Sequence, residues 1–245
     1  MKPSSKNSLE FPRPLVTVDV VIFTVLDDTL KVVLVRRPDD GNEPFPGRWA
    51  LPGGFIDVGK DASLMDCALR KLREKTGVRA PYLEQLGSWG SAHRDPRGWS
   101  ATHAFFALVP GRELVLEKGA NAAQVEWVGA DAALRKKLAF DHGEILASAV
   151  ARLRSKVEYT SLPAFLIEEP FTLPQLQQTY EVVLGRPVDK SAFRKRMLDG
   201  EFMEEAGMAA GTFGRPAMSY RLVDRTQVTL FPRTFSPREG NSADA

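Results

Sequence analysis

The residues best suited to metal or phosphate chemistry follow a Gly-Gly pair and lie on the predicted helix after it. Lys71, Glu74 and Lys75 are spaced i, i+3 and i+4, so they share one face of that helix. Carboxylates clustered on such a face would bind Mg²⁺, which prefers hard oxygen ligands. A lysine ammonium roughly 6 Å from the ion would instead repel it by several kcal/mol at an effective dielectric of about 20. The face therefore predicts neither a catalytic residue nor an ordinary Mg²⁺ site.

Three nearby aspartates, Asp57, Asp61 and Asp66, offer another place for a metal. Asp66 stands at the third position of the helix, where it completes the cap begun by Ser63, and this role explains it without a metal. A displaced metal site on these aspartates stays open as the alternative.

The same half of the chain contains groups that suit a nucleotide. A diphosphate is bound by arginine forks or backbone N–H groups, and an adenine or ribose by an aromatic ring or a polar loop. Because side chains alternate along a strand, only one of Arg36 and Arg37 can face a pocket, and a solvated strand end is the alternative for both. Trp99 as a core residue is also open. The candidate ligand-binding residues are Arg36, Arg37, Gly53, Gly54, Phe55, Arg97 and Trp99.

A second candidate site is the basic helix 190–198. Phe193 and Met197 lie one turn apart and are expected to face a core, which leaves a basic stripe on the exposed side. Such a stripe suits the major groove, where Arg and Lys contact phosphates and guanine edges. A solvated charged face is the simpler alternative. The candidate DNA-binding residues are Lys190, Ser191, Arg194, Lys195 and Arg196, with Arg215 from the glycine-rich turn 211–217.

The pocket residues need a scaffold, and the first 156 residues predict an α/β sandwich. Its helix begins at the Ser63 cap and ends at Gly77, and a longer helix, capped by Asp141, runs to about residue 156. A short helix is expected at 131–138. The predicted strands are 16–23 and 31–37, which form a hairpin around Asp27 and Asp28, then 82–89, 100–109 and 125–128.

The basic helix needs a different scaffold, and residues 157–235 predict three small helices and a β-hairpin. Ser161 caps the first helix, Thr172 begins a capping box that opens the second, and Asp189 caps the third. The predicted strands are 201–206 and 218–222. This combination is typical of a winged helix-turn-helix.

Bulk composition excludes little. The net charge is +2 from 33 basic and 31 acidic residues, so nucleic-acid binding must be argued from local clusters. A single cysteine, Cys67, is interpreted as a small buried helix residue, and no run is apolar enough to cross a membrane, so a cytoplasmic protein is expected. We expect a flexible arm at 1–13, a ligand-sensing domain at 14–156, a DNA-binding domain at 157–235 and a flexible tail at 236–245.

The segment 53–78 resembles the Nudix box, G-x5-E-x7-R-E-U-x-E-E-x-G-U, in which U is aliphatic. The loop-to-helix spacing is two residues longer here, and the glutamate positions of the box are Lys60, Lys71, Glu74 and Lys75. The residues that match are Gly54, Arg70, Leu72, Glu74, Gly77 and Val78. The resemblance implies a Nudix-type α/β/α sandwich that has lost the glutamates needed for Mg²⁺-dependent hydrolysis.

A lysine-substituted box joined to a winged helix is similar to the NrtR family, the Nudix-related transcriptional regulators of NAD metabolism. The similarity extends from about residue 14 to 232 and is carried by LPGGFID (51–57), LRKLREKTGV (69–78), RDPRGWS (94–100), AFDHGEIL (139–146) and the segment 171–197. It implies repression of genes for NAD synthesis or salvage, relieved when ADP-ribose or a related nucleotide binds, with no cofactor required.

Winged helices of this kind are usually two-fold dimers on palindromic double-stranded operators, so a homodimer is expected, with the helix from Asp141 as its connector. Two other functions remain open. One is an active Nudix hydrolase of ADP-ribose or another nucleoside diphosphate derivative, and the other is a winged helix that binds protein.

Overall fold

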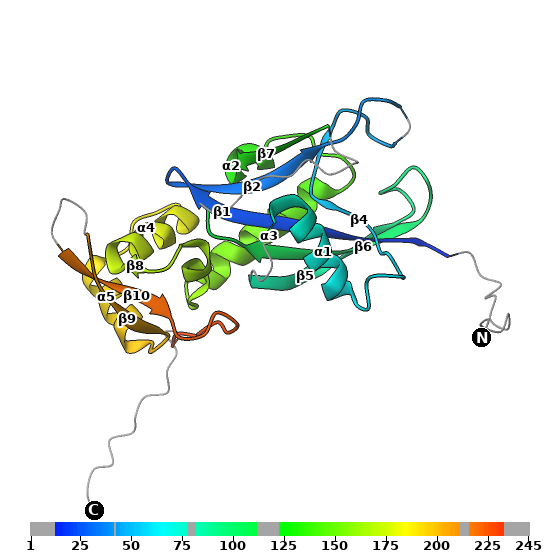
Figure 1. The fold of residues 1–245 in the computed structure, drawn as a ribbon. Helices are drawn as coiled ribbons and strands as arrows, with labels where there is room; N and C mark the ends of the chain where they lie inside the picture. The colour runs from blue at the N-terminus through cyan, green and yellow to red at the C-terminus, as the bar shows by residue number, and fades with distance from the viewer. Residues whose placement is uncertain (1–12, 42, 78–81, 112–122, 211–215, 233–245) are drawn as a thin grey trace, which may run out of the picture.

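The computed structural model describes residues 13–41, 43–77, 82–111, 123–210 and 216–232. The N-terminal half is built on a mixed seven-stranded sheet whose strand order is β3-β2-β1-β6-β5, with β4 beside β1 and β7 beside β2 (Figure 1). The pairing of β1 with β6 is parallel, whereas the other pairings are antiparallel. The strands are β1 (Leu15–Leu26), β2 (Thr29–Arg36), β3 (Trp49–Ala50), β4 (Gly53–Phe55), β5 (Tyr82–Ser91), β6 (Ser100–Leu108) and β7 (Gln124–Gly129).

Alternation along β1 gives the sheet two apolar faces. Val20 and Ile22 pack with α1 (Leu64–Thr76), whereas Val21 and Phe23 pack with α3 (His142–Val157) and the short α2 (Ala130–Leu134). Helices therefore cover both faces, and the predicted α/β/α sandwich is confirmed.

Local sequence signals set the ends of α1 and of the first hairpin as expected. The Ser63 hydroxyl accepts a hydrogen bond from the Asp66 amide, and Gly77 ends the helix at φ +69°. Asp27 and Asp28, both at positive φ, form the turn between β1 and β2. Cys67 is fully buried, on the side of α1 that packs against β1.

Two expectations about the following helices were wrong. The helix expected at 131–138 ends at Leu134, because the Ala139 amide donates to the carbonyl of Trp49 in β3 and draws the chain away. Asp141 does stand at the N-cap of α3, but its side chain makes no capping hydrogen bond and instead accepts two hydrogen bonds from Arg94.

The C-terminal half is a winged helix. A 3-10 turn, η1 (Leu162–Leu166), precedes α4 (Leu173–Leu184) and α5 (Lys190–Asp199). The Thr172 capping box and the Asp189 cap both form as predicted. A three-stranded sheet in the order β8-β10-β9 completes the domain, with β8 (Phe171–Thr172), β9 (Met203–Ala210) and β10 (Pro216–Leu222).

The winged helix differs from expectation in three details. The strand expected at 201–206 begins at Met203 and continues to Ala210, because its partner strand runs from Pro216. The strand β8 was not predicted, since two residues carry no periodicity. Ser161 does not cap the first turn: its hydroxyl accepts a hydrogen bond from the Thr229 amide.

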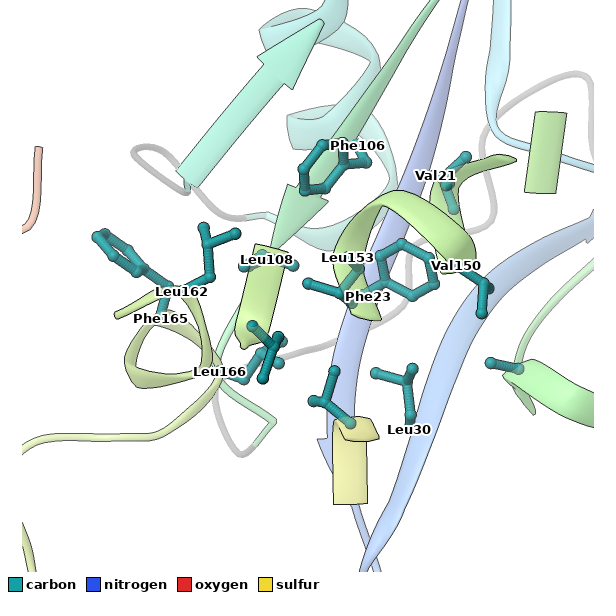
Figure 2. Packing of buried hydrophobic residues seen from close by; sticks show 14 of the residues in the cluster. Val21, Phe23, Leu30, Phe106, Leu108, Val150, Leu153, Leu162, Phe165 and Leu166 are labelled. Carbon is teal, nitrogen blue, oxygen red and sulfur yellow. The ribbon is translucent and has the colours of Figure 1, made fainter. Parts of the chain in front are cut away.

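The two halves share one continuous hydrophobic core. Phe165 lies beside the Tyr82 ring of β5, with the ring centroids 5.2 Å apart. Figure 2 shows Leu162, Phe165 and Leu166 next to Phe23 and Leu108 of the sheet. Figure 1 shows the winged helix at the end of the sheet that carries the β1–β2 hairpin. The core therefore fixes the winged helix against the sandwich.

Some expectations fall outside the described residues. These are the arm up to residue 12, the tail at 236–245, Val78 and Arg215. Among the residues that the structure describes, no helix is long and apolar enough to cross a membrane.

Candidate functional site

A cleft of about 590 Å³ is lined by residues from both ends of the chain segment 17–142. In Figure 1, β4, which borders it, lies at the end of the sheet away from the winged helix. The walls of the cleft come from the first half of β1, from β4, from one face of α1, from the loop at 94–97 and from the start of α3. The residues that line the cleft include Asp19, Arg37, Glu43, Leu51, Gly53, Gly54, Phe55, Arg70, Lys71, Lys75, Arg94, Asp95, Arg97, Phe140 and His142.

The structure brings five of the seven predicted ligand residues to this cleft, namely Arg37, Gly53, Gly54, Phe55 and Arg97. Arg36 and Trp99 do not line it. The Arg36 side chain instead donates to the Gly47 carbonyl at 3.1 Å. Trp99 precedes β6, its side chain is 52% exposed, and it lies against Gly90. Strand alternation thus selects Arg37 over Arg36.

Gly53 and Gly54 are the first two residues of the short strand β4. They pair with Asp19 and Val18 of β1. A β-carbon at Gly53 would lie 1.8 Å from Asp19 Oδ1, and Gly54 has φ +142°, which disfavours any side chain. Both positions need glycine because the two backbones and the Asp19 carboxylate meet here.

Two of the arginines that line the cleft, Arg37 and Arg97, are held by carboxylates and a carbonyl. Arg37 donates to the Pro44 carbonyl at 2.6 Å and to Glu43 at 3.0 Å. Arg97 pairs with Asp95 at 2.9 Å and also reaches Glu43 at 3.2 Å, while its guanidinium lies 5.2 Å from the centre of the Phe55 ring. Glu43 therefore joins both arginines across the mouth of the cleft.

The helix face of the Nudix-like box is cationic. Glu74 accepts from Arg70 at 3.0 Å, and Lys71 Nζ lies 3.8 Å from its other oxygen. Lys75 also lines the cleft, and its burial lowers the pKa of its ammonium. The remaining carboxylate of the box is thus engaged by protein cations at the place where other Nudix boxes carry metal ligands.

The aspartates of the alternative site have separate partners. Asp61 accepts two hydrogen bonds from Arg70, at 2.5 and 2.7 Å, and these bonds hold the pKa of its carboxyl far below the ordinary value. Asp57 pairs with Lys60 at 2.9 Å, and Asp66 accepts from the Ser63 hydroxyl. Within the described part of the chain no group of three His, Cys, Asp or Glu side chains is arranged to hold a metal ion.

Sequence reasoning missed a buried polar cluster at the bottom of the cleft. Asp19 accepts a hydrogen bond from Thr102 at 2.7 Å, and His142 Nε2 lies 3.5 Å from the same oxygen. The Leu51 amide donates to His142 Nδ1 at 2.9 Å, so Nε2 is the ring nitrogen that carries the proton towards Asp19. Arg94, which is 7% exposed, lies 3.9 Å from Asp19 and makes its paired hydrogen bonds to Asp141.

An imidazole, a hydroxyl and a guanidinium stabilise the ionised form of Asp19. Burial by itself would raise the pKa of the Asp19 carboxyl, but the interactions with His142, Thr102 and Arg94 hold it below its ordinary value. The one local signal for this cluster was the single charged residue inside the apolar run 16–23. Thr102 is 83 residues from Asp19 along the chain, and His142 is farther still.

Phe140 lines the same part of the cleft in an unusual backbone conformation. It has φ +53°, which is uncommon for a residue other than glycine, and residues in such strained conformations cluster at functional sites. Its ring lies 4.7 Å from that of Phe45 and 5.1 Å from that of His142, and the Arg37 guanidinium stands 5.1 Å from its centre. This aromatic and cationic wall suits a nucleotide base or its phosphates.

The predicted recognition helix has the expected division between core and solvent. Phe193 and Met197 of α5 are buried, and the Phe193 ring lies 5.1 Å from that of Tyr180 in α4. The remaining predicted residues of this helix, Lys190, Ser191, Arg194, Lys195 and Arg196, are exposed.

Arg196 differs from the other basic residues of α5. Its guanidinium donates to the carbonyl of Glu158, just after α3, at 3.0 Å and lies 6.0 Å from the centre of the Phe231 ring. It therefore points along the protein surface towards α3. Lys195 pairs with Asp199 at 2.6 Å, one helical turn away on the exposed side.

Both halves of the chain match known families. Residues 15–149 match the model of the NUDIX domain, and residues 163–222 match that of the NrtR DNA-binding winged helix domain. The ADPR responsive transcriptional repressor NtrR of Acinetobacter baylyi is 44% identical over 224 residues, which are 91% of this chain and 88% of that protein.

Two solved structures are similar as well. The Shewanella oneidensis NrtR complexed with a 27mer DNA has a TM-score of 0.80 and 41% identity, covering 89% of this chain and 98% of that one. The NUDIX domain of the same NrtR complexed with ADP ribose has a TM-score of 0.55 and 43% identity, covering 61% of this chain and 94% of that one. With both domains matched in order, the chain belongs to the NrtR family of Nudix-related transcriptional regulators.

Proposed function

We propose that the protein is a transcriptional repressor whose winged helix binds operator DNA and whose Nudix domain binds ADP-ribose or a related nucleotide without hydrolysing it. The genes it controls are those of NAD synthesis or salvage. One observation carries this proposal: a cationic nucleotide-sized cleft and an exposed basic recognition helix are fixed to the same hydrophobic core.

The DNA-binding role is supported by the surface of α5. Lys190, Arg194 and Lys195 are exposed on this helix, whereas Phe193 and Met197 are buried. Positively charged groups on an exposed helix bind phosphate by releasing counterions, and a subset reads base edges in the major groove. The similar Shewanella oneidensis NrtR is known in complex with a 27mer DNA.

The nucleotide-binding role is supported by the charges and rings of the cleft. Arg37, Arg97 and Lys71 line its walls and suit a diphosphate, which accepts charge-assisted hydrogen bonds. Phe55 and Phe140 offer rings for a base. The similar NUDIX domain of Shewanella oneidensis NrtR is known with ADP ribose, and the Acinetobacter baylyi relative is an ADPR responsive repressor.

The absence of hydrolysis is proposed from the charge of the α1 face. Lys71 and Lys75 replace acidic ligands, and Glu74 is neutralised by Arg70 and Lys71. Since Mg²⁺ needs several oxygen ligands and is repelled by ammonium groups, nucleotide binding is proposed to need no Mg²⁺. The protein acts as a cytoplasmic homodimer on a palindromic site, because two recognition helices related by a two-fold axis read two half-sites.

The test uses the full chain and labelled duplex DNA from upstream of its own gene. Fluorescence anisotropy is measured at one fixed salt concentration, with and without ADP-ribose, and with a scrambled duplex as the control. Specific binding that ADP-ribose weakens at least tenfold, with EDTA present, is the expected result. Mg²⁺-dependent release of AMP at ordinary turnover, above about 1 s⁻¹, together with no specific DNA binding, would replace this proposal with a hydrolase.

A further inference from the structure

The helix α3 reaches from the ligand cleft to the recognition helix. His142 in its first turn lines the cleft, and Glu158 directly after its last residue contacts α5. Its 16 residues span roughly 24 Å at about 1.5 Å each. One full side of the helix is buried in the core that the two domains share, through Ile145, Leu146, Ala149, Val150, Leu153 and Val157. A helix held in this way transmits a displacement of one end to the other.

The cleft end of α3 contains a carboxylate that is diverted from its usual role. Asp141 stands where a capping residue satisfies the first free N–H groups of a helix, but it makes no such hydrogen bond. Its carboxylate is held by Arg94 through hydrogen bonds of 2.8 and 2.9 Å, and Arg94 lines the cleft.

A nucleotide diphosphate in the cleft would compete with Asp141 for Arg94, because phosphate oxygens accept the same paired hydrogen bonds from a guanidinium. Once released, Asp141 is already in place to cap α3, where a negative charge is favoured by the helix dipole. Arg94 and Asp141 therefore have two mutually exclusive sets of partners, as a two-state element requires.

The other end of α3 is tied to the recognition helix by Arg196. The last carbonyls of a helix have no donor within the helix, and the Arg196 guanidinium supplies one to Glu158 at 3.0 Å. A positive charge is also favoured at this end of the helix dipole. The Glu158 carboxylate meanwhile pairs with Arg186 in the α4–α5 connection at 2.8 Å.

A second contact joins α5 to the same place. The Phe193 ring of α5 packs on Tyr180, whose hydroxyl donates to the Thr160 carbonyl at 2.8 Å. Thr160 lies just beyond α3, and its hydroxyl donates back to the carbonyl of Lys156 within that helix at 2.7 Å. Two contacts therefore fix the orientation of α5 relative to the end of α3: the Arg196 hydrogen bond and the packing of Phe193 on Tyr180.

From these contacts we infer that Arg196 is a positioning residue that holds the recognition helix to the end of α3, and that nucleotide binding at Arg94 reaches DNA through this joint. The inference rests on the proposed function, because it assumes that one protein binds both DNA and a nucleotide. The inference gives Arg196 a different role from Arg194, which lies on the same helix and is exposed to solvent.

The experiment compares Arg196→Gln with the matched control Arg194→Gln in the full chain. DNA affinity is measured over a range of salt concentrations, with and without ADP-ribose, and ADP-ribose affinity is measured by calorimetry without DNA. The Arg196 variant is expected to keep its ADP-ribose affinity and salt dependence, and to keep DNA affinity without nucleotide within about threefold. Its ADP-ribose-induced loss of DNA affinity should shrink at least fivefold.

The Arg194 variant should bind DNA more weakly, with a salt slope smaller by about 1, and should keep the full response to ADP-ribose.

A second variant tests the path from the other end, since Arg196→Gln can also loosen α5. Asp141→Asn removes the charge that holds Arg94 and leaves an asparagine able to cap α3, so it should favour the nucleotide-bound arrangement. Without nucleotide its DNA affinity should fall at least threefold, and the further loss caused by ADP-ribose should shrink. Weak DNA binding by the Arg196 variant, with a smaller salt slope and a full ADP-ribose response, would show a phosphate contact and overturn the inference. A full response in both variants would overturn it too. If the wild-type protein binds no specific DNA, or binds it regardless of ADP-ribose, the proposed function fails and the inference fails with it.

Discussion

At the scale of single residues, the cleft is organised around one buried carboxylate. Asp19 is held by Thr102, His142 and Arg94, and its nearest backbone neighbour is Gly53. The packing leaves no room at that neighbour: an added β-carbon would meet the Asp19 carboxylate and, at 2.8 Å, the carbonyl oxygen of Val18. Gly53 is therefore required by geometry, and a contact with a phosphate is not needed to explain it.

Gly53→Ala is expected to destabilise the protein by about 1–3 kcal/mol, because a backbone oxygen cannot rotate out of the way as a side chain can. The measurement is the free energy of unfolding in urea. Gly143→Ala is the matched control, since a β-carbon there would meet nothing within 4 Å and α3 favours alanine over glycine. Equal stability of wild type and Gly53→Ala would contradict this account of the cleft.

Asp61 provides a pH-dependent test at the same scale. Its pKa is depressed in the folded protein by Arg70, so it adds stability above the ordinary aspartate pKa of about 3.9 and loses that contribution as the pH falls further. The difference in unfolding free energy between wild type and Asp61→Asn should therefore be largest at neutral pH and shrink steadily below about pH 4. In an Arg70→Gln background, the same substitution should show little dependence on pH. A difference in unfolding free energy that grows towards acid pH would contradict a lowered pKa of Asp61.

At the scale of elements, capping residues decide where helices start. Ser63, Thr172 and Asp189 each accept a hydrogen bond from the amide three residues on, and α1, α4 and α5 begin directly after them. Asp141 and Ser161 also directly precede helices but make no cap hydrogen bond, because tertiary partners engage their side chains. Capping residues therefore predict where these helices start, whereas the cap hydrogen bond forms only where no distant partner competes for the side chain.

Thr172→Ala is expected to lower the free energy of unfolding by about 1 kcal/mol, because the Gln175 amide loses its acceptor at the start of α4. Thr172→Ser keeps the hydroxyl and should recover most of the loss. Both are measured by urea denaturation followed by circular dichroism. A serine variant as unstable as the alanine variant would point to the lost methyl group and not to the cap.

At the scale of the whole molecule, the sandwich and the winged helix are continuous. Phe165 is 3% exposed and packs against Tyr82 of the sheet, and Tyr82 in turn lies 6.0 Å from Phe106. The core cluster includes residues of both halves without a break. A shared core makes the relative position of the cleft and the recognition helix a property of the fold.

Two domains that share a core should unfold together. We expect a single calorimetric transition for the wild-type protein, whereas Phe165→Ala should lose about 3–5 kcal/mol and separate the winged helix as an earlier transition. Phe165→Leu keeps most of the apolar area and should keep one transition, at a cost below about 1.5 kcal/mol. Two transitions in the wild type would show that the junction is weaker than its packing indicates.

The sequence by itself determined the features that depend on neighbours along the chain. The caps at Ser63, Thr172 and Asp189, the stop at Gly77 and the buried side of α5 are all local, so propensity and periodicity suffice. That Lys71 and Lys75 stand at acidic positions follows from the resemblance to the Nudix box. The family motifs then supplied the architecture. The exceptions, such as the early end of α2, arise where a distant carbonyl takes a backbone amide.

Only the tertiary structure decided which residues meet in the cleft and at the α3–α5 joint. Arg94 and Asp141 are 47 residues apart, Leu51 and His142 are 91 apart, and Arg196 is 38 residues from Glu158. Each contact depends on sheet register and helix packing, which bring together groups whose local sequence gives no sign of a partner. The physical reason is that ion pairs and hydrogen bonds depend on distance in space, whereas the patterns readable in a sequence record only distance along the chain.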